Sequence, residues 1–170
     1  MSRRLLKFKA SSDGGYLAKY EVDGKQGTDT ITFESTDAPL PELNAALQKM
    51  VDHVVAIAEF PVGWRGDIKI IGVTCTYSND VQGLVITARR ELENSNAPLI
   101  VNTPHFTREP YNEDSEDDIG IFSSECGDDL DALEVQVFGY VDGDRAQKQL
   151  DFGDGTFVGT KEAEAAGVSG

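Results

Sequence analysis

The chain has 170 residues, of which 39% are hydrophobic and 26% charged, which suits one globular domain with a sizeable core. Its 30 Asp and Glu residues outnumber its 15 Lys and Arg residues, so the formal net charge is −15 at pH 7. No apolar run approaches the roughly 18 residues of a membrane-spanning helix, and the start MSRRLLKFKASS lacks the apolar region of a secretory signal. We therefore expect a cytoplasmic protein with no membrane partner.

The negative charge is concentrated in the last third of the chain. Residues 1–108 contain 12 Lys/Arg and 13 Asp/Glu, whereas residues 109–170 contain 3 and 17. Such an imbalance is typical of proteins with an interaction role. An acidic surface that only maintains solubility explains it equally well.

Three strands are expected at the N-terminus. Residues 3–9 alternate so that a strand would carry Arg3, Leu5, Lys7 and Lys9 on one side and Arg4, Leu6 and Phe8 on the other. Residues 16–22 and 28–34 favour two further strands, and the intervening turns contain glycine. The pattern predicts an antiparallel meander.

A helix is expected over residues 41–59, because apolar residues recur there at helical spacing after Pro39 and Pro41. His53 lies within it and is expected at the surface. Residues 60–66 form a connector that contains Trp64, followed by Arg65. A Trp-Arg pair in a loop could stack on a base or a partner, or Trp64 could close the end of the core.

A second meander is expected over residues 68–102, with strands at 68–77, 84–92 and 99–102 and turns at 79–83 and 94–98. Side chains alternate along a strand, so Arg89 and Arg90 should project from opposite faces.

The acidic last third of the chain is expected to contain a loop, a helix and a tail. Residues 108–124 are expected to form a mobile acidic loop, and residues 126–149 a second helix, although 133–137 alternate well enough for a strand. Residues 150–170 should form a flexible tail. The prediction is an α+β domain over residues 1–149, with antiparallel meanders and two packing helices in the order βββα–βββα; an open sheet and a partly open barrel both fit.

The sequence offers little support for catalysis. His53 and His105 lie in different segments without the spacing of a zinc site, and no nucleophile or phosphate-loop motif is present. Cys75 and Cys126 are expected to be reduced thiols. We expect a protein that is not an enzyme and that binds no metal or cofactor.

A binding role has more support. A basic surface and strand aromatics, such as Phe8, Tyr16, Tyr20, Phe33 and Tyr77, suit sequence-tolerant binding of single-stranded DNA. The candidate nucleic-acid contacts are Arg3, Lys7, Lys9, Trp64, Arg65, Arg89 and Arg90. In the tail, Asp151, Phe152, Asp154 and Phe157 suit docking to a basic, apolar groove of a DNA-processing partner.

An alternative hypothesis uses the acidic residues differently. Carboxylates at this density could imitate a phosphate backbone and inhibit a DNA-binding or defence protein of a host. Under either hypothesis, unpaired strand edges could join copies of the chain into a homo-oligomer.

Residues 72–105, GVTCTYSNDVQGLVITARRELENSNAPLIVNTPH, resemble a family of small proteins encoded by bacteriophages and prophages. The matching positions are Gly83, Val85–Ala88, Leu92, Asn94–Asn96, Pro98–Leu99, Asn102–His105 and Asp142–Gln147. The resemblance covers about half the chain. It implies a phage origin, and hence the cytoplasm of a bacterial host, but no particular activity.

Overall fold

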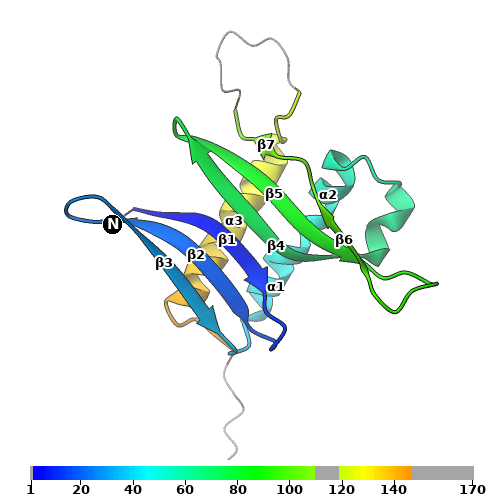
Figure 1. Ribbon diagram of the computed structural model, residues 1–170, viewed down its shortest axis with the longest axis horizontal. Helices are drawn as coiled ribbons and strands as arrows, with labels where there is room; N and C mark the ends of the chain where they lie inside the picture. Colours follow the sequence, from blue (N-terminus) through cyan, green and yellow to red (C-terminus); the bar gives the residue numbers. More distant parts are fainter. Residues whose placement is uncertain (1, 110–118, 147–170) are drawn as a thin grey trace, which may run out of the picture.

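A computed structural model describes residues 2–109 and 119–146 (Figure 1). Most of the acidic loop expected at 108–124 and all of the tail expected at 150–170 lie outside the described residues, including Asp151, Phe152, Asp154 and Phe157. In the described part, no helix is both long and apolar enough to cross a membrane.

The predicted α+β class is confirmed, with an open antiparallel sheet rather than a closed barrel. The N-terminal meander consists of β1 (Arg3–Ala10), β2 (Tyr16–Asp23) and β3 (Thr28–Ser35). The second consists of β4 (Ile68–Ser78), β5 (Val81–Arg90) and β6 (Leu99–Asn102), and a short β7 (Phe106–Thr107) also pairs with β5. The strand order β3-β2-β1-β4-β5-β6 joins the two meanders where β1 pairs with β4.

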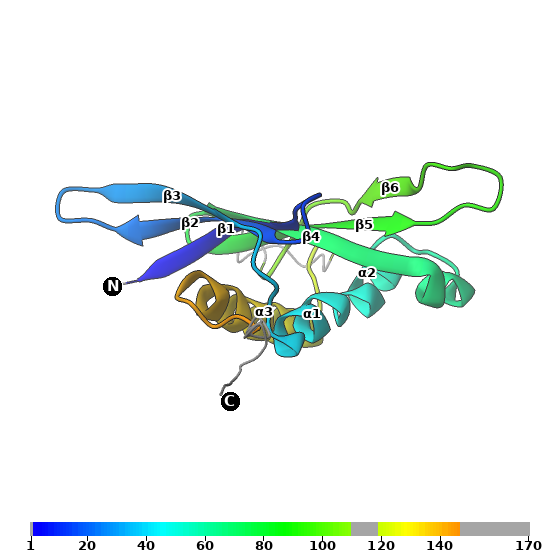
Figure 2. The same cartoon turned by 90° about the horizontal axis from the view of Figure 1, so that it is seen from below.

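All helices cover the same face of the sheet, as Figure 2 shows. They are α1 (Pro41–Gln48), α2 (Val51–Ile57), α3 (Ser124–Val141) and a short 3-10 helix, η1 (Val62–Asp67), in the predicted connector. No helix of the described residues covers the other face, and we call it the open face. The core lies between the sheet and the helices.

The helix expected at 41–59 is divided in two. The Met50 N–H donates to the carbonyl of Leu47, only three residues back, so the chain tightens between α1 and α2. Leu43, Leu47, Met50 and Val54 are nevertheless all buried. The apolar spacing therefore predicted the buried face of these helices correctly, but it did not predict the break between α1 and α2.

The C-terminal helix begins two residues earlier and ends sooner than predicted. The side chain of Ser123 accepts a hydrogen bond from the Cys126 N–H at 3.1 Å and caps the first turn of α3. Residues 133–137 are helical and not a strand, because core side chains recur every three or four residues: Leu130, Leu133, Val137 and Tyr140. The helix stops at Val141, before Gly143 with a φ of +115°.

A bulge in β1 overturns the predicted alternation of that strand. The register with β2 shifts between Leu5 and Lys7, so that Leu5 and Phe8, three residues apart, are both fully buried. Leu5 was expected beside Lys7 and Lys9; it lies instead on the helix side, opposite Tyr20. The bulge separates the core positions of β1 from its two lysines.

His53 is buried rather than exposed, and it joins α2 to α3. Its Nε2 lies 2.6 Å from Oδ2 of Asp129, and the Lys49 ammonium lies 3.3 Å from Oδ1 of the same carboxylate. Burial acts to raise the pKa of Asp129, but hydrogen bonds from His53 and Lys49 outweigh it and hold this pKa below its usual value.

We expect the Asp129→Asn variant to be less stable than the wild type at pH 6, and the difference to shrink on acidification. The folded pKa of Asp129 is lower than the unfolded value of about 3.9, so its contribution is present above that pH and is lost as the pH falls through the folded value. Urea unfolding at pH 6, 4 and 3 measures this. A difference that stays constant down to pH 3 would contradict it.

Candidate anion-binding face

Apart from Arg89, the arginines are engaged in contacts that stabilise the fold. Each of the seven forms an ion pair with a carboxylate of the chain. Arg3 binds Asp142 through two hydrogen bonds of 2.9 Å and lies over the ring of Phe138. These contacts are on the helix side of the sheet, so Arg3 does not share a surface with the predicted strand lysines.

Trp64, Arg65 and Arg90 also belong to the helix side. The Arg90 guanidinium lies 4.1 Å from the centroid of the Trp64 ring and 3.7 Å from Asp67, and Arg65 pairs with Asp52 of α2. The indole of Trp64 is therefore occupied by Arg90 and is not displayed for stacking on a base. Arg89 lies on the opposite face, as the alternation predicted, and pairs with Glu91.

The open face brings Lys7, Lys9 and Arg89 together with two residues that are not among the predicted contacts, Lys19 and Lys69. They flank the buried positions Phe8, Ala18, Ile70 and Ala88, and therefore project away from the helices. The five cations come from four adjacent strands in the order β2, β1, β4 and β5. We call this set, Lys7, Lys9, Lys19, Lys69 and Arg89, the lysine face.

Two pairs of like charges stand directly opposite each other on this face. Lys7 of β1 is paired in register with Lys19 of β2, and Lys69 of β4 with Arg89 of β5. Like charges in such positions destabilise a sheet by roughly 0.2–1 kcal/mol each. Only the register of the strands reveals these pairs, which is why Lys19 and Lys69 were missed.

The four lysines are exposed, and none of them forms an ion pair with another described residue. Hydroxyls continue the row, because Thr32 lies opposite Lys19 and Thr74 opposite Lys7. Glu21 and Glu34 also lie on this face at the β2–β3 side. The lysines are thus the cations that remain available to an external anion.

The predicted base-stacking aromatics are not available. Phe8, Tyr16 and Tyr20 are buried, and Phe33 and Tyr77 pack against the core. The rings of Phe8 and Tyr16 stack on each other at a centroid distance of 4.7 Å. All five face the helices, because they occupy the core positions of their strands, so base stacking on this part of the sheet is excluded.

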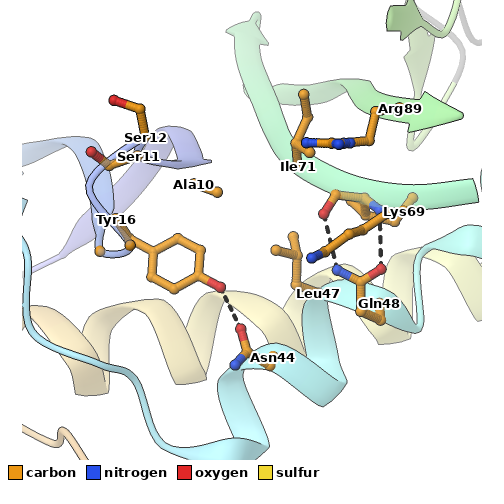
Figure 3. A pocket seen from close by; sticks show the side chains of 13 residues that line it. Ala10, Ser11, Ser12, Tyr16, Asn44, Leu47, Gln48, Lys69, Ile71 and Arg89 are labelled. Carbon is orange, nitrogen blue, oxygen red and sulfur yellow. Dashed lines mark hydrogen bonds between the residues drawn. The ribbon is translucent and has the colours of Figure 1, made fainter. Parts of the chain in front are cut away.

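A cleft of about 590 Å³ opens beside the lysine face, where β1 ends and β4 continues (Figure 3). Pairing of β1 with β4 reaches only from Thr74 to Gly72. Beyond that point the side chain of Gln48 replaces a strand: its Nε2 donates to the Ile70 carbonyl at 2.9 Å and its Oε1 accepts from the Ile70 N–H at 3.0 Å. Gln48 thus satisfies the exposed edge of β4 and leaves a gap in the sheet.

The other buried polar side chains of the described residues stabilise the fold and do not form a site. Gln82 is buried and uses all of its hydrogen-bonding positions: Nε2 donates to Tyr77 and Glu134, each at 3.1 Å, and Oε1 accepts from two nitrogens of Arg108 at 3.1 and 2.8 Å. Burial raises the pKa of both Cys75 and Cys126 to about 12, so neither is a thiolate near neutral pH. Within residues 2–109 and 119–146, no three His, Cys, Asp or Glu side chains gather into a metal site.

Comparison of the chain with protein-family models, with curated proteins and with solved structures gave no match.

Proposed function

We propose that the protein is a non-enzymatic DNA-binding protein whose lysine face contacts the sugar–phosphate backbone of single-stranded DNA. The observation that carries this proposal is the placement of Lys7 opposite Lys19 and of Lys69 opposite Arg89, where Arg89 alone of the four has a carboxylate partner, Glu91. Such pairs cost stability in the free protein. A polyanion laid across the strands offsets this cost, because it supplies the missing counter-charges.

The dimensions suit several phosphates. The cations span three inter-strand steps of about 4.8 Å each, roughly 14 Å in all. A DNA strand that keeps the stacked spacing of a duplex, about 3.4 Å per nucleotide, presents about four phosphates over that length. Lysine ammoniums and threonine hydroxyls are common phosphate contacts and carry no sequence information. The binding should therefore be sequence-tolerant.

The salt dependence of binding tests the proposal. For a fluorescent single-stranded 30-mer, the logarithm of the association constant should fall with the logarithm of salt concentration with a slope of about −3, from about −0.7 per neutralised phosphate. Fluorescence anisotropy between 25 and 200 mM NaCl measures it. The absence of any anisotropy change at 25 mM NaCl with micromolar protein would overturn the proposal.

The proposed DNA-binding role would serve a bacteriophage. The resemblance of residues 72–105 to phage-encoded proteins suggests a role in bacteriophage DNA metabolism inside the bacterial host. The acidic C-terminal third, with Asp151, Phe152, Asp154 and Phe157, would then recruit a replication or recombination protein.

The alternative, an acidic inhibitor that mimics DNA, receives less support from the described residues. Eight of their carboxylates are neutralised by ion pairs with cations of the chain: Asp37, Asp52, Asp67, Asp80, Glu91, Asp129, Asp131 and Asp142. A mimic needs free carboxylates on a rigid surface. A host protein captured from lysate equally well with and without nuclease treatment would favour the inhibitor.

A further inference from the structure

The cleft between β1 and β4 differs in charge from the chain as a whole. Lys69 and Arg89 line it, and no Asp or Glu does, although acidic residues are twice as numerous as basic residues in the sequence. Lys69 has no ion-pair partner among the described residues, whereas Arg89 pairs with Glu91, which does not line the cleft. In Figure 3 its side chain extends into the cleft above Leu47, and Arg89 lies over Ile71 at the rim.

The rest of the lining is mixed. Ser11 and Ser12, from the turn between β1 and β2, supply hydroxyls on the side opposite Arg89. Ile71 supplies apolar surface, Leu47 is almost completely buried, and Asn44 is held by a hydrogen bond from the Tyr16 hydroxyl. A volume of about 590 Å³ is within the range of small-molecule sites. Cations at the rim and an amphipathic interior suit a nucleotide, whose phosphate is charged and whose base is flat and partly apolar.

We infer that the cleft accepts one unstacked base of the strand bound on the lysine face, while the phosphate of that nucleotide lies between Lys69 and Arg89. This inference rests on the proposed function, since both cations belong to the lysine face. Lys9 is adjacent, because it pairs in register with Gly72 at the edge of the cleft, so the backbone contacts lead directly to the cleft. The base packs against Ile71, and the hydroxyls of Ser11 and Ser12 reach its polar edge.

Insertion of a base makes the binding selective for single strands. A paired base must leave its duplex before it can enter, and this extrusion costs several kcal/mol. The lysine face offers no described aromatic side chain, and cations alone would accept single and double strands alike. The cleft thus supplies the discrimination that base stacking provides in other single-strand-binding proteins.

The test compares two 12-mers with the same number of phosphates, one of thymidines and one of abasic tetrahydrofuran units. At 50 mM NaCl, anisotropy should show that the wild-type protein binds the thymidine strand about tenfold more tightly than the abasic strand. Equal affinities would overturn the inference and leave the proposed function intact. If neither strand binds, the proposed function fails, and the inference fails with it.

A variant that fills the cleft sharpens the comparison. Ala10→Leu with Ser12→Leu adds aliphatic bulk at two exposed lining positions without adding a ring or a charge. It should bind both strands with the affinity of the wild type for the abasic strand. The matched control, Ala132→Leu with Ser124→Leu, places the same changes on exposed positions of α3 and should keep the tenfold difference. A cleft variant that keeps the difference would overturn the inference, and the wild-type comparison stands even if that variant does not fold.

Discussion

A variant with Lys7, Lys9, Lys19 and Lys69 all changed to Thr should lose on the order of a thousandfold in affinity for single-stranded DNA at 50 mM salt, because four counterion-releasing contacts disappear. Its free energy of unfolding should nevertheless rise by about 1 kcal/mol. The change removes the repulsion between Lys7 and Lys19 and between Lys69 and Arg89, and it introduces a residue favoured in strands. Anisotropy and urea unfolding measure the two effects separately.

The variant is expected to lose affinity for DNA and to gain stability. A general loss of structure would weaken binding and stability together. Lys25→Thr, in the exposed turn between β2 and β3, should change neither quantity by much, whereas Lys69→Thr alone should reduce the affinity severalfold. The hypothesis is wrong if the variant with four substitutions binds DNA as tightly as the wild type does. It is also wrong if Lys25→Thr weakens binding as much as Lys69→Thr.

The Gln82→Leu variant should lose about 3–5 kcal/mol of stability, a large share of the 5–15 kcal/mol typical of a domain. Leucine fits the buried site in size but leaves the Tyr77 hydroxyl and one oxygen of Glu134 without the donor they now share, and it removes the acceptor of Arg108. Members of a buried network left without partners each cost about 1–3 kcal/mol, and more when charged. Urea unfolding at pH 7 measures the loss.

Glu134→Gln is the matched control, because it keeps an acceptor for Gln82 and removes the charge. Burial raises the pKa of Glu134 despite the hydrogen bond from Gln82, so the folded state holds this proton more tightly than the unfolded chain, whose value is about 4.3. The favourable contribution of the protonated group is present below that value and is lost as the pH rises through the folded pKa. Glu134→Gln should therefore be at least as stable as the wild type at pH 7 and equal to it at pH 4. If Glu134→Gln lost as much stability as Gln82→Leu, the packing of these side chains rather than their hydrogen bonds would account for the stability of the network.

Local patterns predicted most of the strands. Leu99–Asn102 has the predicted bounds, and each of the three N-terminal strands ends one residue later than predicted. Those predictions depend on alternation and on turn residues, which are local. The bulge at Leu5–Lys7 and the break at Met50 were missed because each is a short departure from an otherwise regular pattern, which the spacing of apolar residues does not mark.

The candidate site was predicted only in part for a different reason. Lys7, Lys9 and Arg89 lie on one face, but which cations stay free depends on contacts between residues far apart in the chain. Arg3 meets Asp142, for example, and neither residue signals the other in the sequence. The alternation placed Arg89 and Arg90 on opposite faces correctly, yet only the fold reveals that Arg90 stacks on Trp64.

The division between paired arginines and free lysines has a consequence for how the protein can change over generations. Substituting an arginine breaks an ion pair and in several cases an aromatic contact, so selection on folding will hold these positions. The lysines make no such contacts with the described residues, and their loss would even relieve repulsion. Drift at Lys7, Lys9, Lys19 and Lys69 is therefore restrained only by what they bind, and a lineage that abandoned its ligand would lose these four charges first while its scaffold persisted.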